Sequence, residues 1–281
     1  MRIIKDIREM QKFGNENRQS GKTIGFVPTM GYLHEGHVSL IKLMRQKCDV
    51  LVVSIFVNPA QFGPNEDFEA YPRDFQRDEE LCKEEKVDII FYPDAEQMYR
   101  KPYLTHINVE KITETMCGIS RPGHFQGVAT VVGKLFNIVK PHYAIFGKKD
   151  YQQAVVIKQM VKDLNFDVEI LTGPIVREKD GLAMSSRNKY LSEKDRKKAL
   201  ILNKSLHVAR NLYEEGISSP GMVKMQMEQY IRNEEGVVID YIAIVDAEDL
   251  KPVKEIDKNT LIALAVYVGD TRLIDNIIIG R

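Results

Sequence analysis

Two histidines three residues apart, His34 and His37, stand beside glycines in the segment PTMGYLHEGHVSLI, in a chain with six histidines in all. Gly31 and Gly36 allow the backbone and a helix N-terminus to approach a bulky anion, and the N-terminal amides of a helix attract phosphate. Imidazole N–H groups can donate to phosphate oxygens where negative charge accumulates. A metal site fits less well, because metalloprotease helices place their histidines four residues apart. The segment predicts a phosphate-binding turn, with an incidental histidine pair as the alternative.

A second candidate group lies in GKKDYQQ, which follows an apolar segment. Lys148 and Lys149 would stand at the end of a strand, where a lysine can hold a phosphate as a mobile point charge. Asp150 would stand at the start of a helix and could simply cap it. The alternative is therefore a capping aspartate beside two solvated lysines.

The later segment MSSR, which comprises Met184, Ser185, Ser186 and Arg187, offers two hydroxyls and a guanidinium. Such groups can together hold a triphosphate. Serine-rich loops are common, so this segment alone could equally be a surface loop without a catalytic role.

Gln61 and Gln153 are uncharged hydrogen-bonding residues that follow expected strands. Their amides suit a substrate whose hydroxyl or carboxylate groups must be fixed in place. A solvated side chain is the alternative for either glutamine taken alone.

Alternating apolar strands and helical segments would position these side chains. We expect strands over residues 22–29, 49–58, 87–93, 141–147 and 167–176, of which the first two should be buried. Helices are expected from His37 and over 74–86, 125–140 and 150–164. This alternation predicts a Rossmann-like parallel α/β sheet with helices on both faces. Ligands bind such sheets beyond the carboxyl ends of the strands, so the four polar loops should meet at one edge.

The regular alternation of strands and helices ends after Val176. We expect domain 1–176 to be the Rossmann-like part, 177–190 a flexible loop that carries MSSR, and 191–281 a small α+β lid. The lid should contain helices over 193–215 and 220–235 and strands over 237–246, 260–269 and 271–280.

The overall composition limits the possible partners. Forty basic and forty acidic residues give zero net charge, so no general attraction to nucleic acid or an anionic membrane is expected. The three cysteines have no CxxC spacing, which fits a reducing cytoplasm and neither a disulfide framework nor a zinc site. The charged N-terminus lacks the apolar region of a signal peptide, and no apolar run approaches the roughly 20 residues of a membrane span.

The two-histidine loop and the late MSSR segment together resemble the HIGH and KMSKS signatures of the nucleotidyltransferase superfamily that includes class I aminoacyl-tRNA synthetases. HEGH stands for the first signature. MSSR is a degenerate form of the second, which lacks the first lysine and keeps a terminal cation as Arg187.

Longer motifs narrow the resemblance. PTMGYLHEGHVSLI, FVNPAQFGPNEDFEAYPRD, RPGHFQGVATVVGKLFNIVKPHYAIFGKKDYQQ and REKDGLAMSSRNKYLS are similar to the pantothenate synthetase (pantoate–β-alanine ligase) family over nearly the whole chain. The resemblance implies ATP-dependent condensation of (R)-pantoate with β-alanine through a pantoyl adenylate, with release of AMP and pyrophosphate. It also implies a homodimer.

The resemblance assigns roles to individual residues. It implies His37 as the proton donor, with His34 and Lys149 beside it in catalysis, and Gln61 and Gln153 as pantoate ligands. Gln61 also lies near the β-alanine site in the family. The implied ATP-binding residues are Met30, Gly31, His34, His37, Gly147, Lys148, Lys149, Asp150, Val176, Met184, Ser185, Ser186 and Arg187.

Mg²⁺ is expected to accompany the ATP phosphates, and Asp78 is a candidate helper near the cation, with a solvated helix carboxylate as its alternative. Two other functions stay open from the sequence. One is another HIGH-type nucleotidyltransferase that moves a nucleotide to a phosphorylated acceptor. The other is a non-catalytic nucleotide- or RNA-binding relative of a synthetase, which the neutral charge disfavours.

Overall fold

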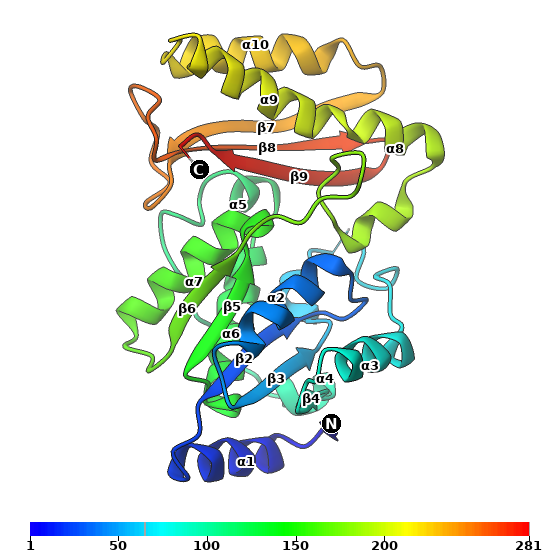
Figure 1. Ribbon diagram of the computed structural model, residues 1–281, viewed down its shortest axis with the longest axis vertical. Coiled ribbons are helices and arrows are strands. Elements are labelled where there is room, and N and C mark those ends of the chain that lie inside the picture. The colour runs from blue at the N-terminus through cyan, green and yellow to red at the C-terminus, as the bar shows by residue number, and fades with distance from the viewer. Residues whose placement is uncertain (65, 281) are drawn as a thin grey trace. The chain divides into compact units, whose positions relative to one another are not determined.

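A computed structural model describes residues 1–64 and 66–280. The chain divides into two compact units (Figure 1). The first comprises Met1–Glu110, Arg121–Lys148 and Val156–Pro174, and the second comprises Lys111–Ser120, Lys149–Val155 and Ile175–Arg281.

The first unit is built on a six-stranded sheet in which all neighbouring strands are parallel. The strand order is β1-β4-β3-β2-β5-β6. The strands are β1 (Arg2–Ile4), β2 (Ile24–Thr29), β3 (Val50–Ile55), β4 (Ile89–Phe91), β5 (Tyr143–Gly147) and β6 (Glu169–Gly173). The predicted parallel α/β sheet is confirmed. β3 is buried at every position, as its continuous apolar run predicts.

Helices cover both faces of this sheet. The helices of this region are α1 (Ile7–Gln19), α2 (Glu35–Arg45), α3 (Phe75–Glu84), α4 (Ala95–Met98), α6 (His124–Val139) and α7 (Tyr151–Asp163), whose first turn groups with the second unit. α2 packs on β2, β3 and β5, whereas α1 packs on α6 and both contact β2. Val27, Ile41, Met44 and Leu51 are fully buried in the cluster formed by α2 and the sheet.

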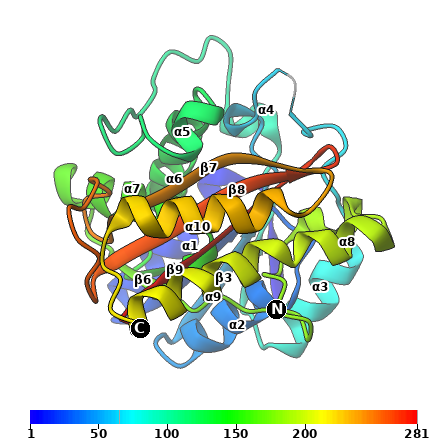
Figure 2. The same ribbon diagram turned by 90° about the horizontal axis from the view of Figure 1, so that it is seen from above.

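The second unit contains a three-stranded antiparallel sheet in the order β7-β8-β9. Its strands are β7 (Val237–Asp246), β8 (Thr260–Val268) and β9 (Thr271–Ile278), and its helices are α5 (Cys117–Ser120), α8 (Glu193–Ala199), α9 (Ile201–Glu214) and α10 (Pro220–Arg232). Figure 2 shows α9 and α10 lying together across this sheet, and both helices contact its strands.

Residues 111–120 join the second unit through a partly buried polar cluster. The Ser120 hydroxyl donates to both carboxylate oxygens of Asp240 at 2.8 Å, and Arg272 donates to Asp240 at 2.6 Å. Met116 is buried in the apolar cluster that contains Leu261 and Ile278. These contacts explain why a short stretch from the middle of the chain belongs to the unit formed mainly by its C-terminal part.

Two details differ from the sequence prediction. The helix predicted over 193–215 is two helices, α8 and α9, which meet at Leu200, where the backbone N–H bonds back to Lys197 at 3.4 Å. The strand β1 and the helix α1 were not predicted, although Asp6 caps α1 by accepting from the Glu9 N–H at 2.8 Å.

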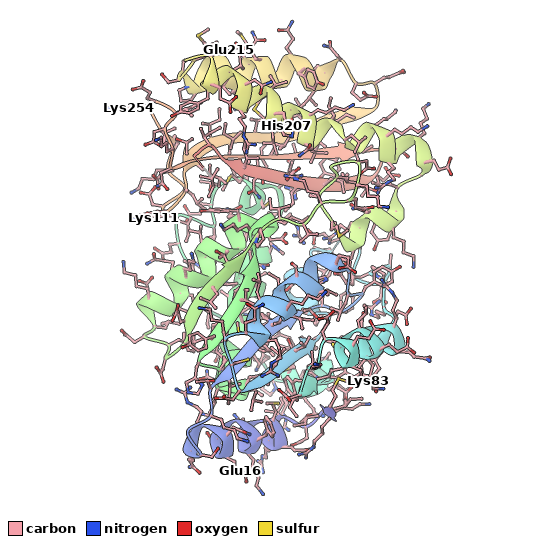
Figure 3. All side chains as sticks on the ribbon, in the orientation of Figure 1. Glu16, Lys83, Lys111, His207, Glu215 and Lys254 are labelled. Atoms are coloured by element: carbon pink, nitrogen blue, oxygen red, sulfur yellow. The ribbon has the colours of Figure 1, made fainter. Side chains whose placement is uncertain are left out.

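Charged side chains lie on the outer sides of several elements. Figure 3 shows Glu16 on α1 and Lys83 on α3 extending away from the first unit, and Glu215 and Lys254 doing so in the second, and all four residues are exposed. Within residues 1–64 and 66–280, no helix is both long enough and apolar enough to span a membrane.

Candidate active site

The loop between β2 and α2 depends on a glycine at its first turn. Gly31 has a φ of +81°, which is the left-handed region that favours glycine. A Cβ at this position would lie 2.9 Å from Ile55 Cγ2 and 3.0 Å from an Asp78 carboxylate oxygen. The loop therefore requires glycine here both for its backbone conformation and for its close contact with β3 and α3.

Asp78 holds the same loop from α3. Its carboxylate oxygens accept from the backbone N–H groups of Tyr32 at 2.7 Å and Leu33 at 2.6 Å, and the residue is 1% exposed. Burial raises the pKa of Asp78 above its usual value, against the opposing effect of these two hydrogen bonds. Asp78 is thus a buried anchor for the loop backbone and not a solvated helix carboxylate.

Within the part of the chain that the structure describes, no group of three or more His, Cys, Asp or Glu side chains could hold a metal ion. Mg²⁺ bound through nucleotide phosphates does not need such a cage, since it keeps several waters and takes one or two carboxylates. The role of Asp78 toward that metal stays a prediction.

His34 and His37 stand at the N-terminus of α2 and form a capping box. His34 Nδ1 accepts from the Gly36 N–H at 3.1 Å, and His37 Nδ1 accepts from the His34 N–H at 3.3 Å. The two ring centroids are 4.1 Å apart. Because each Nδ1 accepts a hydrogen bond, each neutral ring carries its proton on Nε2. The local fold therefore sets two imidazole N–H donors side by side at a helix N-terminus, and their binding of phosphate stays a prediction.

Gln61 lies in the short helix η1 (Pro59–Gln61) after β3 and is 8% exposed. Its Nε2 lies 2.9 Å from Met30 Sδ, so two predicted site residues from different loops meet here. α6 packs closely against this loop, since a Cβ on Gly127 would lie 2.1 Å from the Ala60 carbonyl oxygen. Gly127 thus permits the close approach that places Gln61.

The backbone of Gln61 has a second support that the sequence did not reveal. His124 Nδ1 lies 2.8 Å from the Gln61 carbonyl oxygen, and its Nε2 lies 3.0 Å from Arg121 Nη1. Since a carbonyl accepts and a guanidinium donates, His124 carries its proton on Nδ1. Arg121 also donates to Glu66. The RPGHFQG segment contains these residues, but their contact with Gln61 spans 63 positions and leaves no local signal.

Gly147 ends β5, where it pairs with Gly173 of β6, and Lys148 begins the short helix η2 (Lys148–Asp150). Gly147 is thus the last residue of an internal strand, and Lys148 follows that strand directly, as predicted. Met30, Gly31, His34, His37, Gln61, Gly147 and Lys148 therefore all come from the first unit.

The remaining candidates belong to the second unit. Lys149 Nζ lies 3.7 Å from an Asp150 carboxylate oxygen, and the Lys149 carbonyl accepts from Asn276 at 2.9 Å. Gln153 is partly exposed on α7. Its neighbour Gln152 is buried and bonds to the 111–120 segment, where its amide nitrogen donates to the Ile112 carbonyl at 2.9 Å. The two adjacent glutamines thus differ in burial, and Gln153 is the more exposed of the two.

The segment before MSSR forms a short hairpin, in which residues 176 and 177 pair with residues 183 and 184. The Met184 N–H donates to the Val176 carbonyl at 3.0 Å, and Arg177 pairs with Asp275 at 2.6 Å. Ser185 caps the helix η3 (Ser186–Tyr190) by accepting from the Arg187 N–H at 3.3 Å. Movement of this segment on ligand binding stays a prediction.

Arg196 on α8 braces the same hairpin. It donates to Glu178 at 2.8 Å and to Asp180 at 2.8 Å, and Glu178 also accepts from the Asn188 side chain at 3.0 Å. The residues in these contacts lie on both sides of MSSR in the sequence, with Glu178 and Asp180 before it and Asn188 and Arg196 after it. Arg196 had no predicted role, because an arginine among the alternating charges of EKDRKK looks like a solvated residue.

Comparison with known proteins identifies the family. The family model described as pantoate-beta-alanine ligase matches residues 2–278. The chain belongs to the pantoate-beta-alanine ligase family. The pantothenate synthetase of Thermotoga petrophila is 56% identical over 280 residues, with 100% of both chains covered. That of Caldicellulosiruptor bescii is 56% identical over 279 residues, with 99% of both covered.

Solved structures of this ligase family have the same fold. The crystal structure of pantothenate synthetase from Thermus thermophilus superposes with a TM-score of 0.94 at 43% identity, with 100% of each chain covered. The Francisella tularensis pantoate-beta-alanine ligase, solved with beta-gamma ATP and beta-alanine, gives a TM-score of 0.81 at 36% identity and covers 100% of this chain and 98% of its own. These similarities support an ATP-dependent ligase and do not support the alternative nucleotidyltransferase.

Proposed function

We propose that this ligase family member condenses (R)-pantoate with β-alanine at the expense of ATP, and releases AMP and pyrophosphate. The observation that carries the proposal is the family match over residues 2–278, with relatives named pantothenate synthetase that align along their whole length. The Met30–Gln61 contact and the paired histidine donors give the first unit groups suited to an acid and to a phosphate.

The first chemical step activates the acid. A carboxylate is a poor acyl donor, and attack of the pantoate carboxylate on the α-phosphorus of ATP gives an acyl adenylate with AMP as a good leaving group. Negative charge then grows on the α-phosphate and on the departing pyrophosphate. We assign His34, His37 and Lys149 to this charge, with hydrogen bonds that strengthen in the transition state.

Other residues bind the substrates. Gln61 and Gln153 orient pantoate through its hydroxyls and carboxylate, and Gln61 also serves the β-alanine site. The β and γ phosphates are assigned to Ser185, Ser186 and Arg187. The remainder of the nucleotide is assigned to Met30, Gly31, Gly147, Lys148, Asp150, Val176 and Met184, with Asp150 suited to a ribose hydroxyl.

The second step is attack of the β-alanine amine on the adenylate carbonyl, which needs no nucleophilic serine or cysteine. Mg²⁺, held by the ATP phosphates, would neutralise charge on them. Exclusion of water protects the adenylate from hydrolysis, and this requirement gives the 177–190 loop and the 191–281 lid their proposed roles beside the 1–176 nucleotide-binding domain.

Homodimer formation and a cytoplasmic location are further proposals. The reduced thiols of Cys48, Cys82 and Cys117 suit a reducing compartment. Light scattering at micromolar protein concentration would report the mass in solution, and a monomer would contradict the dimer.

Exchange of radiolabelled pyrophosphate into ATP tests the function directly. Pantoate without β-alanine should support exchange, because adenylate formation is reversible and precedes amide formation. Exchange driven by an amino acid or by a nucleoside monophosphate, with none from pantoate, would contradict the assignment. ATP binding without exchange for any pantoate-like acid would favour a non-catalytic nucleotide-binding protein.

A further inference from the structure

The side chain of Asn58, in the loop after β3, makes four polar contacts that fix the direction of its amide. Its Oδ1 accepts from the Ala60 N–H at 3.3 Å and from the Tyr99 hydroxyl at 2.6 Å. Its Nδ2 donates to the Gly127 carbonyl at 3.1 Å and to Gln61 Oε1 at 3.1 Å. A backbone N–H can only donate and a backbone carbonyl can only accept. The main chain at residues 60 and 127 therefore determines which end of the Asn58 amide carries the oxygen.

This fixed direction is passed on to Gln61. Because Asn58 offers an N–H to Gln61, the atom that faces it must be the Gln61 oxygen. The Gln61 Nε2 consequently lies on the other side, 2.9 Å from Met30 Sδ, which is only a weak acceptor. Gln61 thus presents N–H groups, and such groups match a carboxylate or hydroxyl oxygen of an acid.

The Tyr99 hydroxyl donates to Asn58 Oδ1, because an amide oxygen can only accept. Burial raises the pKa of the Tyr99 hydroxyl above its usual value, so the proton stays on the oxygen at neutral pH. Its ring lies 6.4 Å from that of Phe56 and 5.0 Å from that of Tyr103, and the Lys134 ammonium lies 5.5 Å from its centroid. The ring is therefore packed on several sides, and its hydroxyl is preorganised at 2.6 Å from Asn58.

We propose that Tyr99 is a positioning residue of the acid-binding site. Its hydroxyl holds Asn58 in the direction that the main chain selects, and Asn58 in turn keeps the N–H groups of the Gln61 amide toward the substrate. The proposal rests on the proposed function, in which Gln61 binds pantoate. Tyr99 itself need not touch the substrate, because it acts through the two amides.

Tyr99→Phe is the first test, with Tyr103→Phe as the matched control. The replacement keeps the packed ring and removes the hydroxyl that donates to Asn58. We expect the KM for pantoate in pyrophosphate exchange to rise about tenfold, as loss of one buried hydrogen bond predicts. The KM for ATP should stay within about twofold. Tyr103→Phe, in the same aromatic group, should leave both constants within about twofold of wild type.

Asn58→Asp tests the polarity itself. A carboxylate only accepts, so Gln61 would turn its amide nitrogen toward residue 58 and its oxygen toward the substrate. We expect the pantoate KM to rise by on the order of a hundredfold, more than in Asn58→Ala, because the alanine imposes no direction. Thermal unfolding and the KM for ATP, measured on both variants, show whether each still folds and binds nucleotide.

Each outcome has a defined meaning. A pantoate KM within about twofold of wild type in Tyr99→Phe would overturn the proposal, and so would equal rises for pantoate and ATP, because a generally loosened fold would affect both. An Asn58→Asp variant no worse than Asn58→Ala would also overturn it. Wild-type protein without pantoate-dependent exchange would instead overturn the proposed function, so the two failures are distinguishable.

Discussion

Replacement of Gly31 by alanine should damage the β2–α2 loop in two separable ways. The backbone at Gly31 has a φ of +81°, and an alanine in the left-handed region costs about 1–2 kcal/mol. The new Cβ would also lie 2.9 Å from Ile55 Cγ2, in a buried site where overpacking costs typically about 1–3 kcal/mol. Together these effects should lower the free energy of unfolding by about 2–5 kcal/mol.

A second glycine separates the two contributions. Gly21 has a φ of +76°, but among the described residues, apart from its two chain neighbours, no atom lies within 4 Å of its Cβ position. Gly21→Ala should therefore cost only the conformational part, about 1–2 kcal/mol. Urea denaturation of the two variants, at one pH and ionic strength, gives both values. Equal losses in the two variants would refute the claim that Ile55 and Asp78 crowd position 31.

The same pair of variants separates stability from activity. A shifted loop would displace the His34 and His37 donors, so Gly31→Ala should reduce the rate of pyrophosphate exchange at least tenfold, or about 1.4 kcal/mol of transition-state stabilisation. Gly21→Ala should retain the wild-type rate. A Gly31→Ala protein that is less stable but fully active would show that the loop does not position the catalytic groups.

Three further predictions follow from the contacts. His37→Ala should slow adenylate formation at least a hundredfold while changing pantoate affinity less than about threefold, as single-turnover kinetics and direct binding would show, because its bond strengthens with transition-state charge. Arg196→Gln should raise the KM for ATP about three- to tenfold, since Glu178 loses its charged partner; an unchanged KM would contradict the brace. Burial lowers the pKa of His142, whose Nδ1 accepts from the Ile24 N–H at 2.9 Å. The unfolded chain then binds that proton more readily, so stability should fall as the pH drops below about 6.5, and less steeply in His142→Asn.

Much of the fold could be predicted because its signals are local. The continuous apolar run over 49–58 is typical of a strand buried on both faces, and β3 is buried throughout. The strand predicted over 237–246 is β7 with the same limits. Asp6 is a helix N-cap, but α1 is mostly polar, with Met10 and Gly14 as its buried residues, and neither α1 nor β1 was predicted from the sequence.

The supports of the candidate site could not be predicted, because they join distant segments. Motif residues such as His37 and Gln61 stand out through their type and their place after a strand. The residues that hold Gln61 give no such signal: Tyr99 is 41 positions from Asn58, and His124 is 63 from Gln61. A sequence can reveal which groups do chemistry, whereas the orientation of those groups depends on packing between segments.

The capping box at α2 makes the two histidines hard to replace. Most helix N-termini accept serine, threonine, aspartate or asparagine, so that position is usually free to vary. Here His34 and His37 each accept a backbone N–H through Nδ1, while Nε2 carries the proton. A library that randomises either position must therefore satisfy two selections at once, one for helix initiation and one for turnover. Few side chains other than histidine combine an acceptor and a donor on opposite edges of one rigid ring.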